Sequence, residues 1–211
     1  MVQAQPIWLG QVHGHRVVRL SLDTARPGEV LVDGQAHSGP IQADGSWTTE
    51  FDLACAVMVA DCLPILLAGP SGRGVAALHA GWRGLCGIGP EMAGVGVVEV
   101  GLAQLCHGLG CEPHEVKAWL GPCIGPDAFE VGPEVQAAFD PGDRRCFKPH
   151  AQRHRKWLAD LPALARARLG RLGVAQLTGG HWCTFSETSR FYSFRREPIT
   201  GRQAALIWRR V

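Results

Sequence analysis

The sequence predicts an α+β fold in which mixed β-sheets pack against helices, with the active site at strand ends. Short apolar runs rich in valine, isoleucine and leucine end at glycine, proline or aspartate, which is typical of strands. Two longer segments repeat apolar residues every three or four positions, which is typical of helices. The chain has 211 residues, 46% of them apolar, enough to bury one core. We therefore expect residues 1–211 to form a single domain.

The apolar runs predict six strands. The unbroken apolarity of several of them indicates burial on both faces of a sheet. The expected strands are Ile7 to Val12, Arg16 to Leu20, Leu53 to Ala60, Ile65 to Ala68, Val75 to His79 and Ala204 to Trp208.

The helical pattern is clearest from Glu91 to His107, where Pro90 suits the first turn, and from Leu158 to Leu172. A shorter helix is expected from Pro133 to Phe139. Two segments read as loops because they are rich in glycine and proline or in polar residues. They are the rigid loop from Ala118 to Phe129 and the surface loop from Asp140 to Lys156.

Composition excludes several classes of function. The formal charge is +2 without a sustained basic stripe, so no nucleic-acid partner is expected. The longest apolar stretches fall short of the roughly 18 residues that a membrane helix needs, and the first residues do not resemble a secretory signal. We expect a cytoplasmic protein. Eight cysteines without a CxxC pair argue against a disulfide framework or a zinc-finger clip.

Reactive side chains lie beside glycine or proline at three expected strand ends. These segments are Gln11 to Gly14, Ala60 to Pro64 and His79 to Gly84. In the last of them, two glycines permit a tight turn whose N–H groups suit an anion, and Arg83 adds a fork of donors. The alternative is that His79 is an ordinary strand-end histidine and Arg83 a surface cation.

Asp61 and Cys62 interrupt an otherwise continuous apolar segment. An unpaired buried carboxylate costs several kcal/mol, so Asp61 requires a partner or a function. Cys62 can be a nucleophile, a thiolate ligand or a small buried residue. With His13 and His79 it makes a His/Cys/His set, and three protein ligands with an open fourth position is the pattern of catalytic zinc. Copper is less well supported, since no methionine lies in a blue-copper context.

Together these segments, and several later ones, resemble the laccase-domain family, long labelled polyphenol oxidases. The resemblance runs from about Trp8 to the C-terminus and is most specific in the string His79-Ala80-Gly81-Trp82-Arg83-Gly84. The later segments are Leu120-Gly121-Pro122, Ile124-Gly125-Pro126, Phe129-Glu130-Val131-Gly132, Phe191-Tyr192-Ser193-Phe194-Arg195-Arg196 and Thr200-Gly201-Arg202.

The resemblance implies a cytoplasmic enzyme that binds one zinc through His13, Cys62 and His79. It implies a purine nucleoside phosphorylase, which converts adenosine, inosine or methylthioadenosine and phosphate into the base and ribose 1-phosphate. Adenosine deamination is a second activity, and some bacterial members are described as peptidoglycan editing factors. The oligomeric state stays open.

For this reaction we expect Arg83 and Arg195 to complement phosphate. Asp61 is either a proton acceptor in deamination or, preferably, the carboxylate that orients a zinc-bound histidine. Tyr192 either stacks on a base or belongs to the core.

The chain departs from the family pattern in two places. It begins shortly before His13, without the N-terminal segment that members usually carry, and Phe194 stands where tyrosine is common. Three other functions stay open. They are a cysteine hydrolase editing peptidoglycan precursors, with Cys62 as nucleophile and His79 as base, a copper-dependent polyphenol oxidase, and a catalytically weak binding module.

Overall fold

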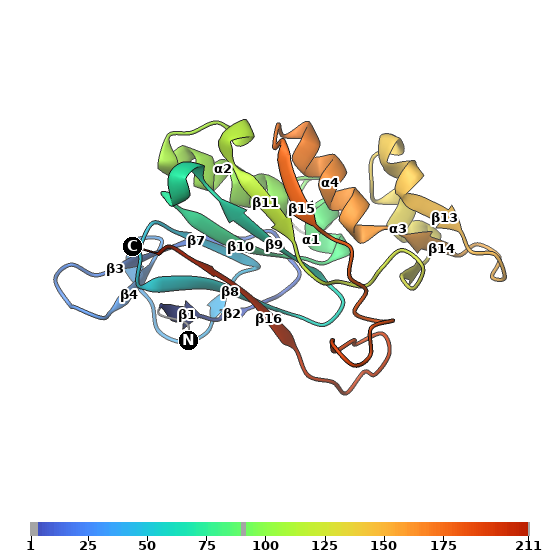
Figure 1. The fold of residues 1–211 in the computed structure, drawn as a ribbon, viewed down its shortest axis with the longest axis horizontal. Helices are drawn as coiled ribbons and strands as arrows, with labels where there is room; N and C mark the ends of the chain where they lie inside the picture. Colours follow the sequence, from blue (N-terminus) through green and yellow to red (C-terminus); the bar gives the residue numbers. More distant parts are fainter. Residues whose placement is uncertain (1–3, 90–91, 211) are drawn as a thin grey trace.

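The computed structural model describes residues 4–89 and 92–210, and the fold is α+β, as predicted (Figure 1). Its centre is an eight-stranded mixed sheet in the order β15-β11-β9-β10-β7-β3-β4-β5. From one edge to the other, these strands are Gln176–Gly179, Lys117–Leu120, Leu63–Ala68, Val75–Ala80, Gly45–Thr48, Val17–Leu22, Val30–Val32 and Gln35–Ala36.

A smaller sheet covers one face of the large one. It has the order β1-β8-β16, in which β1 is parallel and β16 antiparallel to β8. Its strands are Gln5–Ile7, Leu53–Val59 and Gln203–Trp208. The remaining strands form two minor sheets. One has the order β12-β14-β13, with strands Glu130–Val131, Trp157–Ala159 and Phe147–Pro149. The other pairs β2 and β6, at Leu9–Gly10 and Ile41–Gln42.

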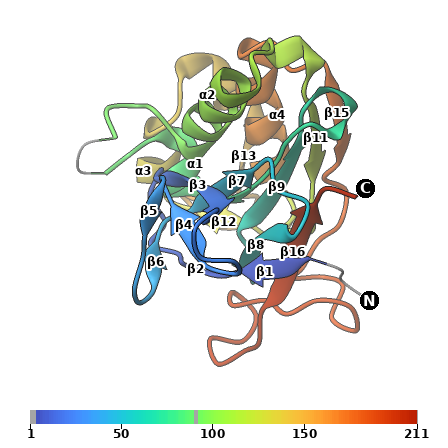
Figure 2. The ribbon, with the colours of Figure 1, turned by 90° about the vertical axis from the view of Figure 1, so that its left-hand side faces the viewer.

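The helices cover the other face of the large sheet, so the molecule has three layers (Figure 2). The α-helices are α1 at Trp82–Cys86, α2 at Val97–Leu109, α3 at Pro133–Ala137 and α4 at Leu161–Arg171. Short 3₁₀ helices lie at Pro70–Gly72, Pro113–Glu115 and Pro141–Cys146. None of the helices in the described ranges has the length and apolarity needed to cross a membrane.

Strand β10 shows why the apolar runs are continuous. Ala76, Leu78 and Ala80 pack into the cluster under the helices, whereas Val75 and Ala77 pack into the cluster under the small sheet. Because successive side chains of a strand point to opposite faces, a strand between two covered faces must be apolar throughout. This confirms the prediction of strands that are buried on both faces.

The expected helix from Glu91 begins later, at Val97. Ala93 and Gly94 have φ angles of 44° and 81°, outside the right-handed helical region, and Gly96 caps the helix. The expected first-turn residue Pro90, like Glu91, lies outside the described residues.

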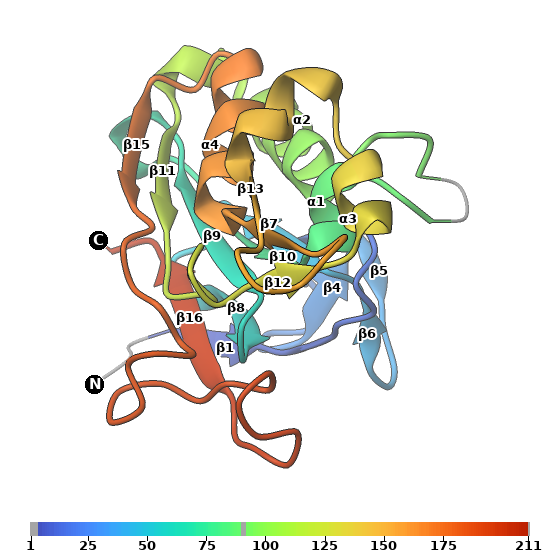
Figure 3. The same ribbon diagram turned by 90° about the vertical axis from the view of Figure 1, so that its right-hand side faces the viewer.

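The other boundary errors have local causes. The helix expected from Leu158 begins at Leu161, because Trp157–Ala159 is strand β14 and the Asp160 carboxylate caps the helix by accepting from the Ala163 N–H at 2.9 Å. The loop expected from Ala118 begins inside β11, and the polar stretch from Asp140 contains β13. Figure 3 looks onto the end of the molecule that carries α3 and β13.

Candidate metal centre

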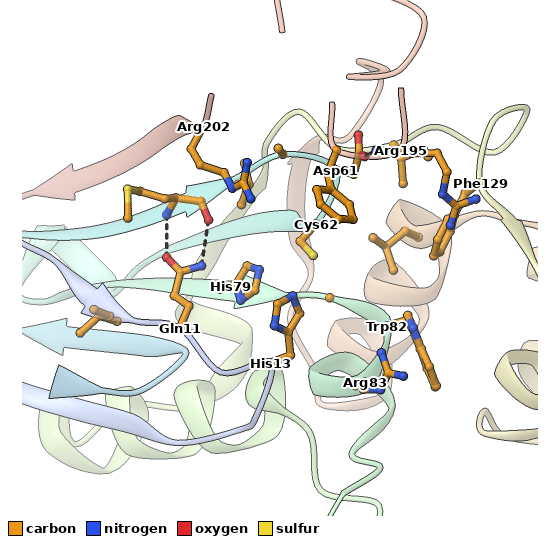
Figure 4. A pocket seen from close by; sticks show the side chains of 18 residues that line it. Gln11, His13, Asp61, Cys62, His79, Trp82, Arg83, Phe129, Arg195 and Arg202 are labelled. Carbon is orange, nitrogen blue, oxygen red and sulfur yellow. Dashed lines mark hydrogen bonds between the residues drawn. The ribbon is translucent and has the colours of Figure 1, made fainter. Parts of the chain in front are cut away.

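Side chains from three segments distant in sequence meet at one end of the large sheet. His13 follows β2, Cys62 lies between β8 and β9, and His79 is in β10. Their candidate ligand atoms all lie within 4.8 Å of one another. The rings of His13 and His79 meet edge to face, with centroids 4.8 Å apart (Figure 4). The structure thus brings together the three residues that the sequence analysis grouped.

Antiparallel pairing places Cys62 beside His79. Strands β9 and β10 are paired with Leu63 opposite Ala80 and Pro64 opposite His79, so the residue before β9 reaches the histidine. Asp61 has a φ of 93°, an uncommon value for a residue with a side chain. Such backbone strain is often found at functional sites and is sustained by the surrounding contacts.

A carboxylate that the sequence analysis missed holds His79. Asp44 is fully buried, and its Oδ1 accepts a hydrogen bond from Nδ1 of His79 at 2.8 Å. Burial by itself raises the pKa of Asp44, but hydrogen bonds from His79, Gly14 and His13 outweigh it and the pKa lies below its usual value. Asp44 is therefore an ionised acceptor at neutral pH.

The same environment separates charge between Cys62 and His79. Burial opposes ionisation of the thiol, but hydrogen bonds with His13 and His79 lower the pKa of Cys62 to about 6. Burial also opposes protonation of His79, but Asp44 and Cys62 raise its pKa to about 9. Without a metal, the pair is a thiolate and an imidazolium at neutral pH. A thiolate is also the form that binds metals.

The space between these side chains suits a metal ion. A Cβ added at Gly81 would come within 3.1 Å of both Cys62 Sγ and His13 Cδ2, so the glycine keeps this space open. Tetrahedral zinc with bonds of about 2.0–2.3 Å separates its nitrogen and sulfur ligands by about 3.5 Å. Ligand atoms within 4.8 Å of one another therefore need only small side-chain shifts to enclose an ion.

The cluster opens into a cavity of about 530 Å³, within the range of small-molecule sites. Three arginines line this cavity together with the cluster. Arg83 lies over the Trp82 ring, 4.5 Å from its centroid. Arg195 lies 5.5 Å from the Phe129 ring centroid and donates from Nη1 to the Glu130 carbonyl. Figure 4 shows Arg83 on one side of the cluster, and Arg195 and Arg202 on the other.

The third arginine, Arg202, was quoted in a motif but given no role. Its Nη1 donates to the carbonyls of Thr200 and Gly201, and its guanidinium lies 6.0 Å from the Phe194 ring centroid. These contacts hold the cation at the cavity wall. The cavity therefore offers cationic groups on two sides, which suits an anionic substrate.

Comparison with known proteins identifies the family. The family model described as "Multi-copper polyphenol oxidoreductase laccase" matches residues 1–210. The chain belongs to this laccase-domain family. The word laccase in that description is a family label and does not establish copper or oxidase chemistry here.

Curated laccase-domain relatives carry a different functional name. Purine nucleoside phosphorylase YfiH of Escherichia coli (strain K12) is 42% identical over 97% of this chain and 74% of its own length. Purine nucleoside phosphorylase PA4543 of Pseudomonas aeruginosa is 45% identical over 98% of this chain and 75% of its own. Phosphorylase activity is therefore supported at the level of the family.

Solved laccase-domain structures share the fold. Protein NMB0706 of Neisseria meningitidis has a TM-score of 0.78 and 38% sequence identity to this chain. The match covers 97% of this chain and 75% of the NMB0706 chain. YlmD of Geobacillus stearothermophilus has a TM-score of 0.77 and 26% identity, covering 98% of this chain and 74% of its own.

In this laccase-domain chain, Asp61 does not orient a histidine, which was the role that the sequence analysis preferred for it. Its Oδ1 accepts from the Thr184 hydroxyl at 2.6 Å and its Oδ2 from the Arg195 backbone N–H at 2.7 Å. Asp44 occupies the position beside His79 instead. Asp61 lines the cavity and ties the segment that carries Arg195 to the cluster.

Tyr192 is half-exposed and is absent from the residues that line the cavity. The Tyr192 ring lies against Gly201, where an added Cβ would come within 2.8 Å of it, and the Tyr192 N–H donates to the Gln203 side chain. Phe194, two residues later, does line the cavity and is 53% exposed. Of its two expected roles, a place in the core does not fit the half-exposed Tyr192, and stacking on a base stays a prediction. Phe194, and not Tyr192, lines the cavity.

Proposed function

We propose that the protein is a zinc-dependent purine nucleoside phosphorylase that acts on adenosine, inosine or methylthioadenosine in the cytoplasm. The observation that carries the proposal is that a His/Cys/His cluster opens into a cavity lined by three arginines. Hydrolysis of a neutral nucleoside does not require cationic groups, whereas phosphorolysis must hold phosphate. The names of the curated relatives support the same reaction class.

In phosphorolysis, an oxygen of phosphate attacks the anomeric carbon while the bond to the base breaks and positive charge develops on the ribose. Much of the catalysis is therefore positioning and charge stabilisation. The exposed guanidinium of Arg83 can bind two phosphate oxygens. Arg195 and Arg202 supply further positive charge at the opposite wall.

The apolar part of the cavity suits the base and the sugar. Phe194 presents a half-exposed ring, and Leu9, Met58 and Val59 line the same cavity. Aromatic side chains stack on purines, whose faces are apolar. The cavity thereby combines a surface for the base with cationic groups for phosphate.

His13, Cys62 and His79 would hold the zinc at the wall of the cavity. A zinc ion held there would supply Lewis acidity toward an oxygen of phosphate or of a substrate hydroxyl. Copper is the less favoured ion, because two histidines and one cysteine with an open fourth position are a usual ligand set of catalytic zinc.

The test is to incubate metal-loaded protein with adenosine, with and without phosphate, and to separate the products by chromatography. The proposal predicts adenine and ribose 1-phosphate only when phosphate is present. Inosine that forms independently of phosphate would instead indicate adenosine deamination as a second or main activity. Absence of both products with adenosine, inosine and methylthioadenosine would reject the proposal.

A cysteine hydrolase is the second candidate, because Cys62 and His79 form a thiolate–imidazolium pair in the absence of metal. The two functions differ in their response to metal. Alkylation of Cys62 that zinc blocks and chelation restores supports the metal centre. Hydrolysis of a peptidoglycan precursor by metal-free protein, lost on alkylation, would support the hydrolase.

A further inference from the structure

Asp44 is bonded to two of the three members of the cluster. Its Oδ1 accepts from the His13 backbone N–H at 2.9 Å as well as from His79 Nδ1. Its Oδ2 accepts from the backbone N–H groups of Val12 at 3.2 Å and Gly14 at 2.7 Å. Each carboxylate oxygen thus accepts two hydrogen bonds in a fully buried position.

The three backbone donors come from consecutive residues, Val12 to Gly14. Consecutive N–H groups that converge on one point form an anion-binding concavity, and here a carboxylate of the same chain fills it. His13 has a φ of 61°, in the left-handed region that residues with side chains rarely adopt. The bonds to Asp44 hold the loop in this conformation, and the conformation directs the His13 ring toward the cluster.

Asp44 also fixes the ring of His79. An ionised carboxylate accepts hydrogen bonds only, so the proton of the His79 ring must be on Nδ1. Nε2 is then the nitrogen with a free lone pair when the ring is neutral. The Asp44 carbonyl also accepts from the His79 backbone N–H at 2.7 Å, so residue 44 holds both the main chain and the ring of His79.

We propose that Asp44 is a positioning residue that presents His13 and His79 together to a metal ion, through the backbone of one and the ring of the other. The inference rests on the proposed metal centre but not on the reaction that the centre performs. Carboxylates that orient one metal-bound histidine are common. Here a single carboxylate positions two ligands that lie 66 residues apart in the sequence.

Asparagine cannot replace Asp44, although it has the same shape. If its amide oxygen faces His79 and His13, its NH₂ group faces the N–H groups of Val12 and Gly14, and donors oppose donors. If the amide is turned over, its NH₂ group faces the ring and His13 instead. The first orientation leaves the Val12 and Gly14 N–H groups unpaired. The second leaves the His13 N–H unpaired and bonds to His79 only if the ring proton moves from Nδ1 to Nε2, which removes the lone pair available to a metal ion.

The experiment measures zinc affinity by competition with a chromogenic chelator, for the unaltered protein and for D44N. We expect D44N to bind zinc about 10- to 100-fold more weakly. The visible absorption of bound Co²⁺, which reports ligand geometry, should change in the same variant. D44N that binds zinc as tightly as the unaltered protein, with an unchanged cobalt spectrum, would overturn the inference.

Asp143 provides the matched control. It is also fully buried, and it is bound by two nitrogens of Arg171 at 2.7 and 3.0 Å, at the end of α4 away from the cavity-lining Leu161. D143N should lose stability without weakening zinc binding. An equal loss of zinc affinity in both variants would show that general destabilisation, and not positioning, explains D44N.

A second measurement requires no variant and covers the case in which D44N does not fold. Long-range ¹H–¹⁵N NMR of the zinc-loaded protein should show the His79 proton on Nδ1 and the metal on Nε2. The opposite arrangement would reject the role of Asp44. If the unaltered protein binds no metal ion at all, the proposed function fails. If the unaltered protein and D44N bind zinc equally well, only the role of Asp44 fails.

Discussion

A Cβ placed on Gly81 would lie 3.1 Å from the Cys62 sulfur, closer than most real contacts of this kind. The same atom would lie 3.1 Å from Cδ2 of His13. Because Gly81, at the start of α1, has no side chain, Cys62 and His13 can both lie close to His79. The φ angle of Gly81 is −72°, a value that any residue can adopt. Glycine is therefore needed here for space and not for the backbone conformation.

The G81A variant should therefore weaken metal binding without unfolding the protein. The added methyl group must displace the thiolate or the imidazole, and we expect a loss of zinc affinity of about tenfold, as for other disturbances of ligand orientation. The measurement is chelator competition. Gly142, where an added Cβ would meet nothing within 4 Å, supplies the control G142A, which should bind zinc normally. Unchanged affinity in G81A would show that the cluster has more room than the structure indicates.

Replacing Cys62 with alanine should remove both bound zinc and phosphorolysis. Two imidazoles alone make a weak zinc site, because the thiolate supplies the negative charge and the strongest bond. Metal content and adenine production measure the two effects. C86A alters a buried cysteine outside the cavity lining and should retain both. A metal-free C62A that still converts adenosine at the original rate would eliminate the metal-dependent mechanism.

Loss of the Arg83 guanidinium should weaken phosphate more than nucleoside. A hydrogen bond to a charged group is worth about 1.5–3 kcal/mol, so R83Q should raise the KM for phosphate by about tenfold or more. The KM for adenosine should change much less. The control R73Q alters an exposed arginine away from the cavity lining. If R83Q and R73Q had the same kinetics, Arg83 would have no part in phosphate binding.

Cys62 of the metal-free protein should react with iodoacetamide at unusually low pH. The thiolate is the reactive form, and the pKa of Cys62 is lowered to about 6, so the rate should rise as the pH passes through about 6 and then level off. Burial raises the pKa of Cys55 to about 12, so Cys55 should stay unreactive at neutral pH. Mass spectrometry of alkylated peptides measures both. A Cys62 rate that keeps rising up to pH 9 would contradict the thiolate–imidazolium pair.

The same pair makes the stability of the metal-free protein depend on pH in two directions. The folded pKa of Cys62 lies below its unfolded value, so its contribution is present at high pH and is lost as the pH falls through about 6. The folded pKa of His79 lies above its unfolded value, so its contribution is complete below about 6.5 and is lost as the pH rises through about 9. Between about pH 6.5 and 9 the contribution of Cys62 grows with pH while that of His79 falls, so urea unfolding of the parent in chelator should show nearly constant stability from this pair. In C62A only the contribution of His79 remains, and stability should fall as the pH rises through this range. A C62A profile identical to the parent's would show that the pair contributes nothing.

The sequence by itself indicated the most apolar strands of the two stacked sheets, β3, β8, β9, β10 and β16, but not β7, and it assigned most of the residues of β11 to a loop. Local composition was sufficient because burial on both faces demands continuous apolarity, as in Val75 to Ala80. It also indicated His13, Cys62 and His79, because each lies in a short, chemically unusual segment at a strand end. Helix boundaries were less accurate, since the positive φ angles at Ala93 and Gly94 that delay α2 produce no apolar period.

Only the tertiary structure decided which carboxylate serves the cluster. Asp61, next to Cys62 in sequence, bonds to Thr184 and to the Arg195 backbone, whereas Asp44 reaches His79 across 35 positions. The same is true of Phe194, which lines the cavity, and Tyr192, which does not. Periodicity records which face of an element is buried, but hydrogen bonds between distant segments depend on sheet pairing and strand register, and a single sequence does not specify these.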